Sequence, residues 1–181
     1  MRPPFRFLFA LGLGLLACKK PVAPGQPCSN EGEALCQSTT QLLACRSGAW
    51  SEVNCGGPKG CSTSEGAITC DESIGREGEP CSQGERAHYA CSADGPNRLV
   101  CAAGRWKLGS TCRGPKGCEA HSSLVACDDS IAQAGDPCVN EGDSACSVDG
   151  KAVLACKGGV FGPATTCRGR CAAQGLTVRC Q

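Results

Sequence analysis

The spacing of the cysteines limits this chain more than any other feature of its sequence. Six cysteines recur three times in the same order with similar gaps, and each set opens with Gly-x-Pro-Cys. The stretches between neighbouring sets, 70–81 and 127–138, share their length and their Asp, Ser, Ile, Gly and Pro positions. Such self-similarity predicts tandem copies of one small structural unit. The three sets, each numbered from its first to its sixth cysteine, are Cys28, Cys36, Cys45, Cys55, Cys61 and Cys70; Cys81, Cys91, Cys101, Cys112, Cys118 and Cys127; and Cys138, Cys146, Cys156, Cys167, Cys171 and Cys180.

Crosslinks are needed because each unit has few large apolar side chains. Cysteine makes up 19 of the 181 residues, a level typical of disulfide scaffolds in oxidising compartments. Burying one large apolar side chain contributes about 1.5–3 kcal/mol, whereas ordering one residue's backbone costs about 1–2 kcal/mol. Three disulfides at roughly 2–4 kcal/mol each would offset the shortfall. Six cysteines allow about 15 pairings; our interpretation joins the fourth to the fifth, such as Cys55 to Cys61, because they enclose a short turn-rich loop.

Short strands and turns are the secondary structure that the repeat predicts. After the third cysteine each set reads Cys-x-x-Gly-x-aromatic, which indicates a hairpin with Gly48, Gly104 or Gly159 closing a type I turn with a bulge. Asp94-Gly95 and Asp149-Gly150 predict an earlier turn in the second and third sets. A last short strand precedes the sixth cysteine, and helical periodicity is absent apart from a turn near Asp71 or Asp128. We therefore expect a small, disulfide-rich, all-β fold of three tandem modules, each a short β-meander or hairpin unit.

These patterns divide the chain into seven segments. Ile74 and Ile131 lie in the two linkers, which look flexible, and they would be able to connect neighbouring modules. The predicted segments are a signal peptide at 1–17, a lipidated cysteine with a tether at 18–27, modules at 28–70, 81–127 and 138–180, and linkers at 71–80 and 128–137.

The N-terminus resembles that of bacterial lipoproteins. Arg2 and Arg6 precede an apolar run from residue 7 to 17, which suits a signal peptide and is too short to span a bilayer. The sequence Leu-Leu-Ala-Cys at 15–18 resembles the lipobox of that family. The resemblance implies diacylglyceryl attachment to Cys18 and cleavage before it, and removing Cys18 leaves an even number of cysteines. An ordinary signal peptide remains the alternative.

The same resemblance predicts where the protein resides. Two or more acyl chains anchor a protein stably to a membrane, so we expect the cell envelope. Lys19 follows Cys18, and the absence of Asp there predicts the outer membrane by the usual sorting rule for enterobacterial lipoproteins.

Composition and spacing disfavour several classes of function. The chain has 18 basic and 17 acidic residues, so we expect no nucleic-acid partner. The sequence has no Cys-x-x-Cys pair, and His88 and His121 both belong to the second set, so we expect no metal and no cofactor. Neither histidine has a repeated Asp or Ser partner, and an exported chain favours disulfides over free thiolates; we therefore expect no enzyme.

Two groups of residues are candidates for binding. Lys59 and Lys116 occur in the loops Gly-Pro-Lys-Gly, which are either solvated turns or rigid loops of a protease inhibitor. Trp50, Trp106 and Phe161 share one repeat position, and they either cover a disulfide or form exposed platforms for sugar rings or peptides. The six-cysteine pattern with its aromatic residue is distantly similar to peritrophin-type chitin-binding modules, although the short first gap departs from that pattern.

These observations predict a lipid-anchored envelope protein without enzymatic activity. Its expected role is surface interaction, with an envelope protein, a neighbouring cell or a polysaccharide as partner. A disulfide-braced protease inhibitor and a purely structural spacer remain alternatives.

Overall fold

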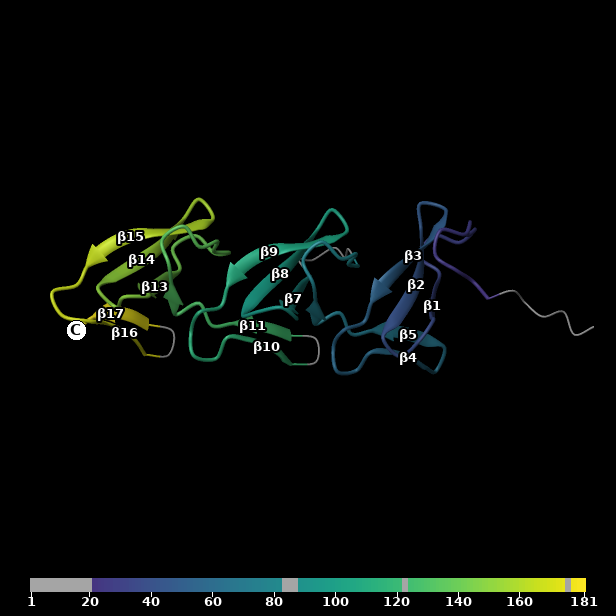
Figure 1. Cartoon of the computed structure of the whole chain (residues 1–181), viewed down its shortest axis with the longest axis horizontal. Coiled ribbons are helices and arrows are strands. Elements are labelled where there is room, and N and C mark those ends of the chain that lie inside the picture. The colour runs from purple at the N-terminus through teal and green to yellow at the C-terminus, as the bar shows by residue number, and fades with distance from the viewer. Residues whose placement is uncertain (1–20, 83–87, 122–123, 175–176) are drawn as a thin grey trace, which may run out of the picture.

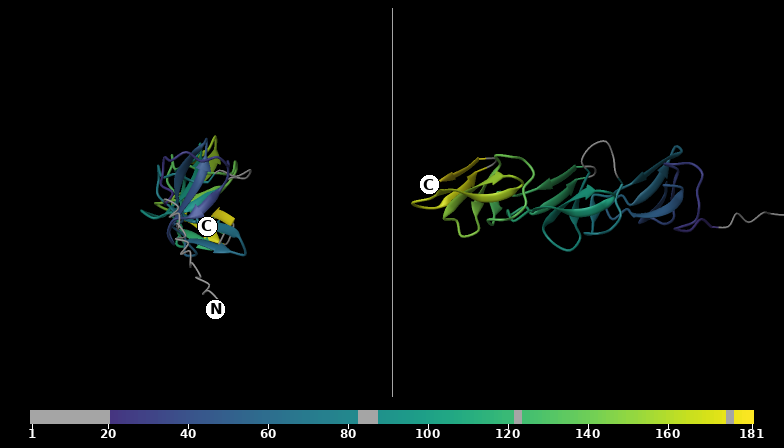
Figure 2. Two further views of the ribbon diagram at one scale, coloured as in Figure 1. Left: turned by 90° about the vertical axis from the view of Figure 1, so that its right-hand side faces the viewer. Right: turned by 90° about the horizontal axis from the view of Figure 1, so that it is seen from above.

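The computed structural model of the chain describes residues 21–82, 88–121, 124–174 and 177–181. These residues form short strands and turns, and none of them is in a helix. Figure 1 shows three β units that follow one another along one axis, and Figure 2 shows them end-on as a narrow cross-section and from above as a rod. The expected disulfide-rich, all-β fold is confirmed. Residues 28–70, 81–127 and 138–180 are called modules 1, 2 and 3.

Each module begins with a three-stranded antiparallel meander, as predicted. Apolar residues of the middle strand are buried, as Leu42 and Leu43 are in module 1. Modules 2 and 3 have one more residue before the fourth cysteine, and their last meander strand carries a β-bulge there. The meander strands are β1 (Ala34–Cys36), β2 (Gln41–Arg46) and β3 (Ala49–Asn54) in module 1; β7 (Tyr89–Ser92), β8 (Asn97–Ala102) and β9 (Arg105–Thr111) in module 2; and β13 (Ser144–Ser147), β14 (Ala152–Lys157) and β15 (Val160–Thr166) in module 3.

The turn after the third cysteine differs in type from the prediction. Gly48, Gly104 and Gly159 have positive φ angles, as expected, but the residue before each of them does too, Ser47 at 53° for example. Two central residues with φ above zero in a two-residue hairpin correspond to a type I′ turn. The predicted type I turn with a bulge is therefore wrong, because the two-residue loop matches the twist of the flanking strands without an extra residue.

Each module ends with a second hairpin, whose last strand was predicted and whose first strand was not. In module 1 this hairpin turns at Glu65 and Gly66, which also have positive φ angles. The hairpins are β4 (Cys61–Ser64) with β5 (Ala67–Cys70), β10 (Cys118–His121) with β11 (Leu124–Cys127), and β16 (Cys171–Gln174) with β17 (Thr177–Cys180).

The predicted linkers each contribute a strand to the module that follows. In residues 71–80, called joint 1, β6 (Ile74–Gly75) pairs in parallel with β7. In residues 128–137, called joint 2, β12 (Ile131–Ala132) pairs in parallel with β13. Both isoleucines thus pair with the module that follows them, and each joint belongs to the sheet of that module.

The expected tether is packed against module 1 over residues 21–27. Val22 contacts the cluster that contains Leu43 and Trp50. The Gly25 N–H donates to the Trp50 carbonyl oxygen at 2.8 Å, and the Trp50 N–H donates to the Gln26 carbonyl oxygen at 2.9 Å. A tether over this range is wrong because these hydrogen bonds fix its backbone. The predicted signal peptide and Cys18 lie outside the described residues.

Candidate functional site

The nine disulfides follow one pairing order in all three modules. The first cysteine bonds to the third, the second to the fifth and the fourth to the sixth. In module 1, Cys61 and Cys70 lie opposite each other in the second hairpin, yet Cys61 bonds to Cys36 and Cys70 bonds to Cys55. The predicted pairing of the fourth with the fifth cysteine is wrong because these two cysteines connect the hairpin to different parts of the meander. The bonds clamp the two halves of each module together.

The candidate aromatic residues cover the first disulfide of each module. Trp50, Trp106 and Phe161 are 7%, 1% and 2% exposed, and each lies directly opposite the third cysteine on the neighbouring strand. Trp50 contacts Cys28 and Cys45, and equivalent clusters form in the other two modules. Side chains this deeply buried have no free face for a ligand. The interpretation as exposed binding platforms is therefore wrong, and these residues belong to the core.

The candidate lysines lie at exposed turns whose backbone is bound to the joints. The Lys59 N–H donates to Asp71 Oδ2 at 3.0 Å, and the Lys116 N–H donates to Asp128 Oδ2 at 3.1 Å. A Cβ atom on Gly57 would overlap the Asp71 carboxylate, so this close contact requires glycine. Each turn therefore fastens the end of one module to the joint that follows it.

The two joint aspartates have lowered pKa values. Burial raises the pKa of Asp71 and of Asp128, but hydrogen bonds outweigh it. These come from Ser73 and Lys59 to Asp71, and from Ser130 and Lys116 to Asp128. Both carboxylates are therefore charged acceptors at neutral pH, and their role is to hold the joints.

Joint 1 is also held by side chains that cross from module 1. Arg46 donates from Nη1 to the Cys81 carbonyl oxygen and from Nη2 to Ser82 Oγ, both at 2.9 Å. Asn54 Nδ2 donates to Glu79 Oε2 at 3.3 Å. These contacts fix module 2 relative to module 1 by hydrogen bonds from polar side chains.

A shallow cavity of about 220 Å³ lies at joint 1, and Lys59, Glu72, His88 and Tyr89 contribute to its lining. Glu72 is buried, and its Oε2 accepts the Ser82 N–H at 2.8 Å. His88 Nδ1 lies 3.0 Å from the Ser82 carbonyl oxygen, to which it donates, and 4.0 Å from Glu72 Oε2. Glu72 and His88 are thus both held by the backbone of Ser82, at the start of module 2.

Joint 2 is held by an ion pair that the sequence analysis missed. Arg113 Nε donates to Asp136 Oδ2 at 2.7 Å, and its Nη2 donates to Asp136 Oδ1 at 3.1 Å. The arginine holds the pKa of Asp136 below its usual range, although burial opposes the shift. The signal in the sequence was the Asp of Gly-Asp-Pro-Cys together with an Arg after the fourth cysteine.

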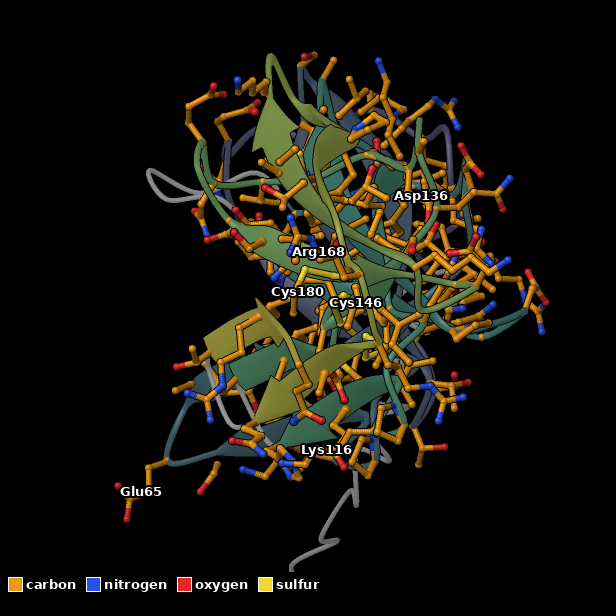
Figure 3. The ribbon with its side chains drawn as sticks, turned by 90° about the vertical axis from the view of Figure 1, so that its left-hand side faces the viewer. Glu65, Lys116, Asp136, Cys146, Arg168 and Cys180 are labelled. Carbon is orange, nitrogen blue, oxygen red and sulfur yellow. A yellow bond between two sulfur atoms is a disulfide. The ribbon has the colours of Figure 1, made fainter. Side chains whose placement is uncertain are left out.

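Module 3 has a shorter version of the loop between the fourth and fifth cysteines. Residues 167–171 read Cys-Arg-Gly-Arg-Cys and lie at the C-terminal tip of the rod in Figure 1. Figure 3, viewed from that end, shows Arg168 beside Cys180. Arg168 and Arg170 are exposed, so this tip presents positive charge to solvent.

The described residues contain no group of three or more His, Cys, Asp or Glu side chains placed to hold a metal ion. Nor does any helix among them have the length and apolar character needed to cross a membrane. Comparisons of the chain with known protein families, with curated proteins and with solved structures find no match.

Proposed function

We propose that this chain is a lipid-anchored protein of the bacterial cell envelope that acts as a stiff spacer and displays its last module for interaction. The proposal assigns no enzymatic activity to the chain. The lipobox-like Leu15-Leu16-Ala17-Cys18 supports the anchor at Cys18, and the paired cysteines support an oxidising compartment. Its expected partners are an envelope protein, a neighbouring cell or a surface polysaccharide.

The continuous pairing across both joints carries the proposal of a stiff rod. The Cys91 N–H donates to the Ser73 carbonyl oxygen, and the Cys146 N–H donates to the Ser130 carbonyl oxygen, both at 2.8 Å. A chain that connected its modules by free linkers would leave these groups to water. Because the backbone of each joint is bound to the next sheet, the modules cannot rotate independently without breaking hydrogen bonds.

The anchor would place module 1 directly at the bilayer. Residues from Val22 onward are packed on module 1, so only Lys19, Lys20 and Pro21 separate it from a lipid on Cys18. The axis of the rod would then carry module 3 to the end farthest from the anchor. This arrangement suits contact with a partner beyond the membrane surface.

The first experiment tests the anchor. We would measure the intact mass of the protein extracted from its own membranes, with thiols blocked before and after reduction. We expect acylation at Cys18, no free thiol before reduction and eighteen thiols afterwards. In a Cys18→Ser variant the protein should leave the membrane fraction while its other cysteines stay oxidised. An unacylated protein that remains with the membrane would contradict the anchor.

The second experiment tests the rod. Small-angle X-ray scattering of the oxidised chain should give the profile of one elongated body. The matched flexible control has six residues, alternating Gly and Ser, inserted after Asp71. The insertion separates Asp71, which binds the Lys59 turn of module 1, from β6, which pairs with module 2. If the unmodified chain scatters like this control, the modules move independently and the rod is wrong.

A further inference from the structure

The C-terminal module contains an uncompensated set of positive charges. Between Gly150 and Gln181 the sequence has five cationic residues and neither Asp nor Glu. All five are exposed: Lys151, Lys157, Arg168, Arg170 and Arg179. Among the described residues, no carboxylate forms an ion pair with any of the three arginines. The nearest acid along the chain, Asp149, accepts hydrogen bonds from the Ser147 hydroxyl and from the Lys151 N–H.

Disulfides hold the three arginines in fixed positions. Arg168 follows Cys167 and Arg179 precedes Cys180, and these two cysteines are bonded to each other. Arg170 precedes Cys171, which is bonded to the meander through Cys146. The Gln181 N–H also donates to the Arg170 carbonyl oxygen at 2.9 Å. A rigid backbone lowers the entropy lost when these side chains bind a ligand.

The structure contains a precedent for what such an arginine binds. Arg168 follows the fourth cysteine of module 3 as Arg113 follows that of module 2. The glycine after each arginine lies close to the residue that follows the sixth cysteine: Gly114 lies by the Asp128 side chain and Gly169 by the Gln181 backbone, although the loop of module 3 is two residues shorter. Arg113 binds a carboxylate through two hydrogen bonds, a planar geometry that suits guanidinium and carboxylate. Arg168 presents the same group, and no residue that the structure describes forms an ion pair or a side-chain hydrogen bond with it.

We propose that the tip of module 3 binds an acidic polysaccharide through carboxylates on its sugar rings, with Arg168 at the centre and Arg170 and Arg179 beside it. This inference deepens the proposed function, on which it rests for the biological setting. The cations are spread over a loop and a hairpin, which suits a linear polymer with repeated charges better than a single small anion. The aromatic residues are buried, so recognition is electrostatic, without stacking on the sugar rings.

A second copy of the chain fits this tip less well. Asp136 of joint 2 precedes the Pro-Cys that opens module 3, and Gln26 holds the corresponding position before module 1. A second rod stacked head-to-tail would present Gln26 to Arg168. The Gln26 side chain is neutral, and its Oε1 already accepts the Ala23 N–H at 3.1 Å. Head-to-tail stacking would therefore offer Arg168 no carboxylate at the position that Asp136 holds for Arg113.

The test measures binding of the oxidised full chain to polygalacturonate in solution, which does not depend on the anchor. We expect an Arg168→Gln/Arg170→Gln variant to bind about tenfold more weakly. The slope of log affinity against log salt concentration should become less steep by roughly two, one for each arginine removed. The matched control is Lys59→Gln/Lys116→Gln, which removes the same charge from the corresponding loops of modules 1 and 2. It should bind within about twofold of the unmodified chain. Arg168→Lys should be intermediate, because lysine keeps the charge and loses the paired hydrogen bonds.

Three results would overturn the inference. These are absence of binding to polygalacturonate, equal losses in the two double variants, and binding to polyglutamate in preference to polygalacturonate, which would indicate a protein partner. Oxidation of all eighteen cysteines in each variant, checked by mass, excludes misfolding as the cause. Because the anchor and the rod are tested separately, failure here would leave the proposed function standing.

Discussion

Joint 1 and joint 2 follow the same backbone path but are held by different side chains. Both contribute a short parallel strand, and both contain an aspartate that binds the preceding turn. In joint 1, Asn54 and Arg46 reach across through hydrogen bonds, whereas in joint 2 Arg113 forms an ion pair with Asp136. The shared backbone indicates that main-chain pairing sets the direction of the rod. The side chains then determine how stable each joint is.

The packing beneath the two joints differs in a complementary way. In joint 1, Gly75 lies against Trp106, and a Cβ atom placed on it would be 2.7 Å from Trp106 Nε1. In joint 2, Ala132 is fully buried in a cluster with the smaller ring of Phe161. A large ring is thus paired with glycine and a smaller ring with alanine. Each joint strand has the side-chain volume that its aromatic partner allows.

The largest expected effect on the stability of a joint comes from changing the size of the joint residue that lies against the aromatic ring. Gly75→Ala should weaken joint 1 by about 1–3 kcal/mol, because the added methyl group overpacks against the indole ring. The measurement is hydrogen exchange of the Cys91 N–H, which should speed up by about tenfold for each 1.4 kcal/mol. Trp106→Phe in the same chain should restore much of the protection. Ala132→Gly is the control in joint 2, where a loss of about 1 kcal/mol is expected from the removed methyl group and the added backbone freedom.

This comparison fails if the ring is not the cause. Unchanged exchange at Cys91 in Gly75→Ala would contradict it, as would a double variant with no recovery. The Cys146 N–H in joint 2 should be unaffected by either change to joint 1, which separates a local effect from loss of the whole fold.

The next effect compares the side chains that cross the joints. Arg113→Ala should reduce protection of the Cys146 N–H by about 1 kcal/mol, since a charge-assisted pair is lost from a partly buried site. Asn54→Ala should reduce protection of the Cys91 N–H by about 0.5 kcal/mol, because its hydrogen bond is single and long. Added salt should reduce the difference between the two losses of protection, because it screens the ion pair of Arg113. Equal losses in the two joints, or no effect of salt, would show that the ion pair adds nothing.

The sequence predicted the repeated unit well because its signals are local. The three meanders, the final strands and the positive φ angles of Gly48, Gly104 and Gly159 all follow from short motifs. The disulfide pairing did not follow, because closeness in sequence between Cys55 and Cys61 does not give closeness between their side chains. Cys55 follows the last residue of one strand and Cys61 begins another, so the pairing depends on how the second hairpin folds over the meander.

The joints and the arginine tip needed the structure for a similar reason. Residues 71–80 and 128–137 have the Gly and Pro content of linkers, and only their partners in the next module give them strand geometry. The aromatic residues had two interpretations, and sequence alone could not separate a covered ring from an exposed one. The role of Arg113 appears only when Asp136, twenty-three residues later, lies against it.

Acidification should change the stability of the joints by a smaller amount. At first joint 2 should become more stable while joint 1 becomes less stable. Burial raises the pKa of Asp129 in joint 2, assisted by Asp143 and Asp128 and opposed by Arg98. A raised pKa in the folded state means that Asp129 favours folding when protonated, so joint 2 should tighten as acid protonates it above the ordinary pKa of about 4. Asp136 and Asp128 have lowered pKa values, so their contribution is lost as the pH falls below that range.

Protection of the Cys146 N–H, corrected for intrinsic exchange, should therefore pass through a maximum on acidification. In joint 1 the pKa of Asp71 is lowered, so protection of the Cys91 N–H should fall on acidification. Asp129→Asn should remove the rise in joint 2 and leave the later fall unchanged. A monotonic fall in both joints of the unmodified chain would mean that Asp129 is not strained in its charged form.

The smallest expected effect concerns Arg46, which has no counterpart in joint 2. Its two hydrogen bonds end on a backbone carbonyl and a hydroxyl, and Ala102 and Val139 occupy the corresponding positions of joint 2. Arg46→Ala should cost joint 1 only about 0.5 kcal/mol, because water replaces much of what is lost. The reverse change, Ala102→Arg with Val139→Ser, should add a similar amount to protection of the Cys146 N–H if the two joints share their geometry. Greater protection of the Cys146 N–H would show that the backbone path of joint 2 already places these two positions in contact. If protection does not increase, although Arg46→Ala measurably weakens joint 1, the joints differ in shape as well as in side chains.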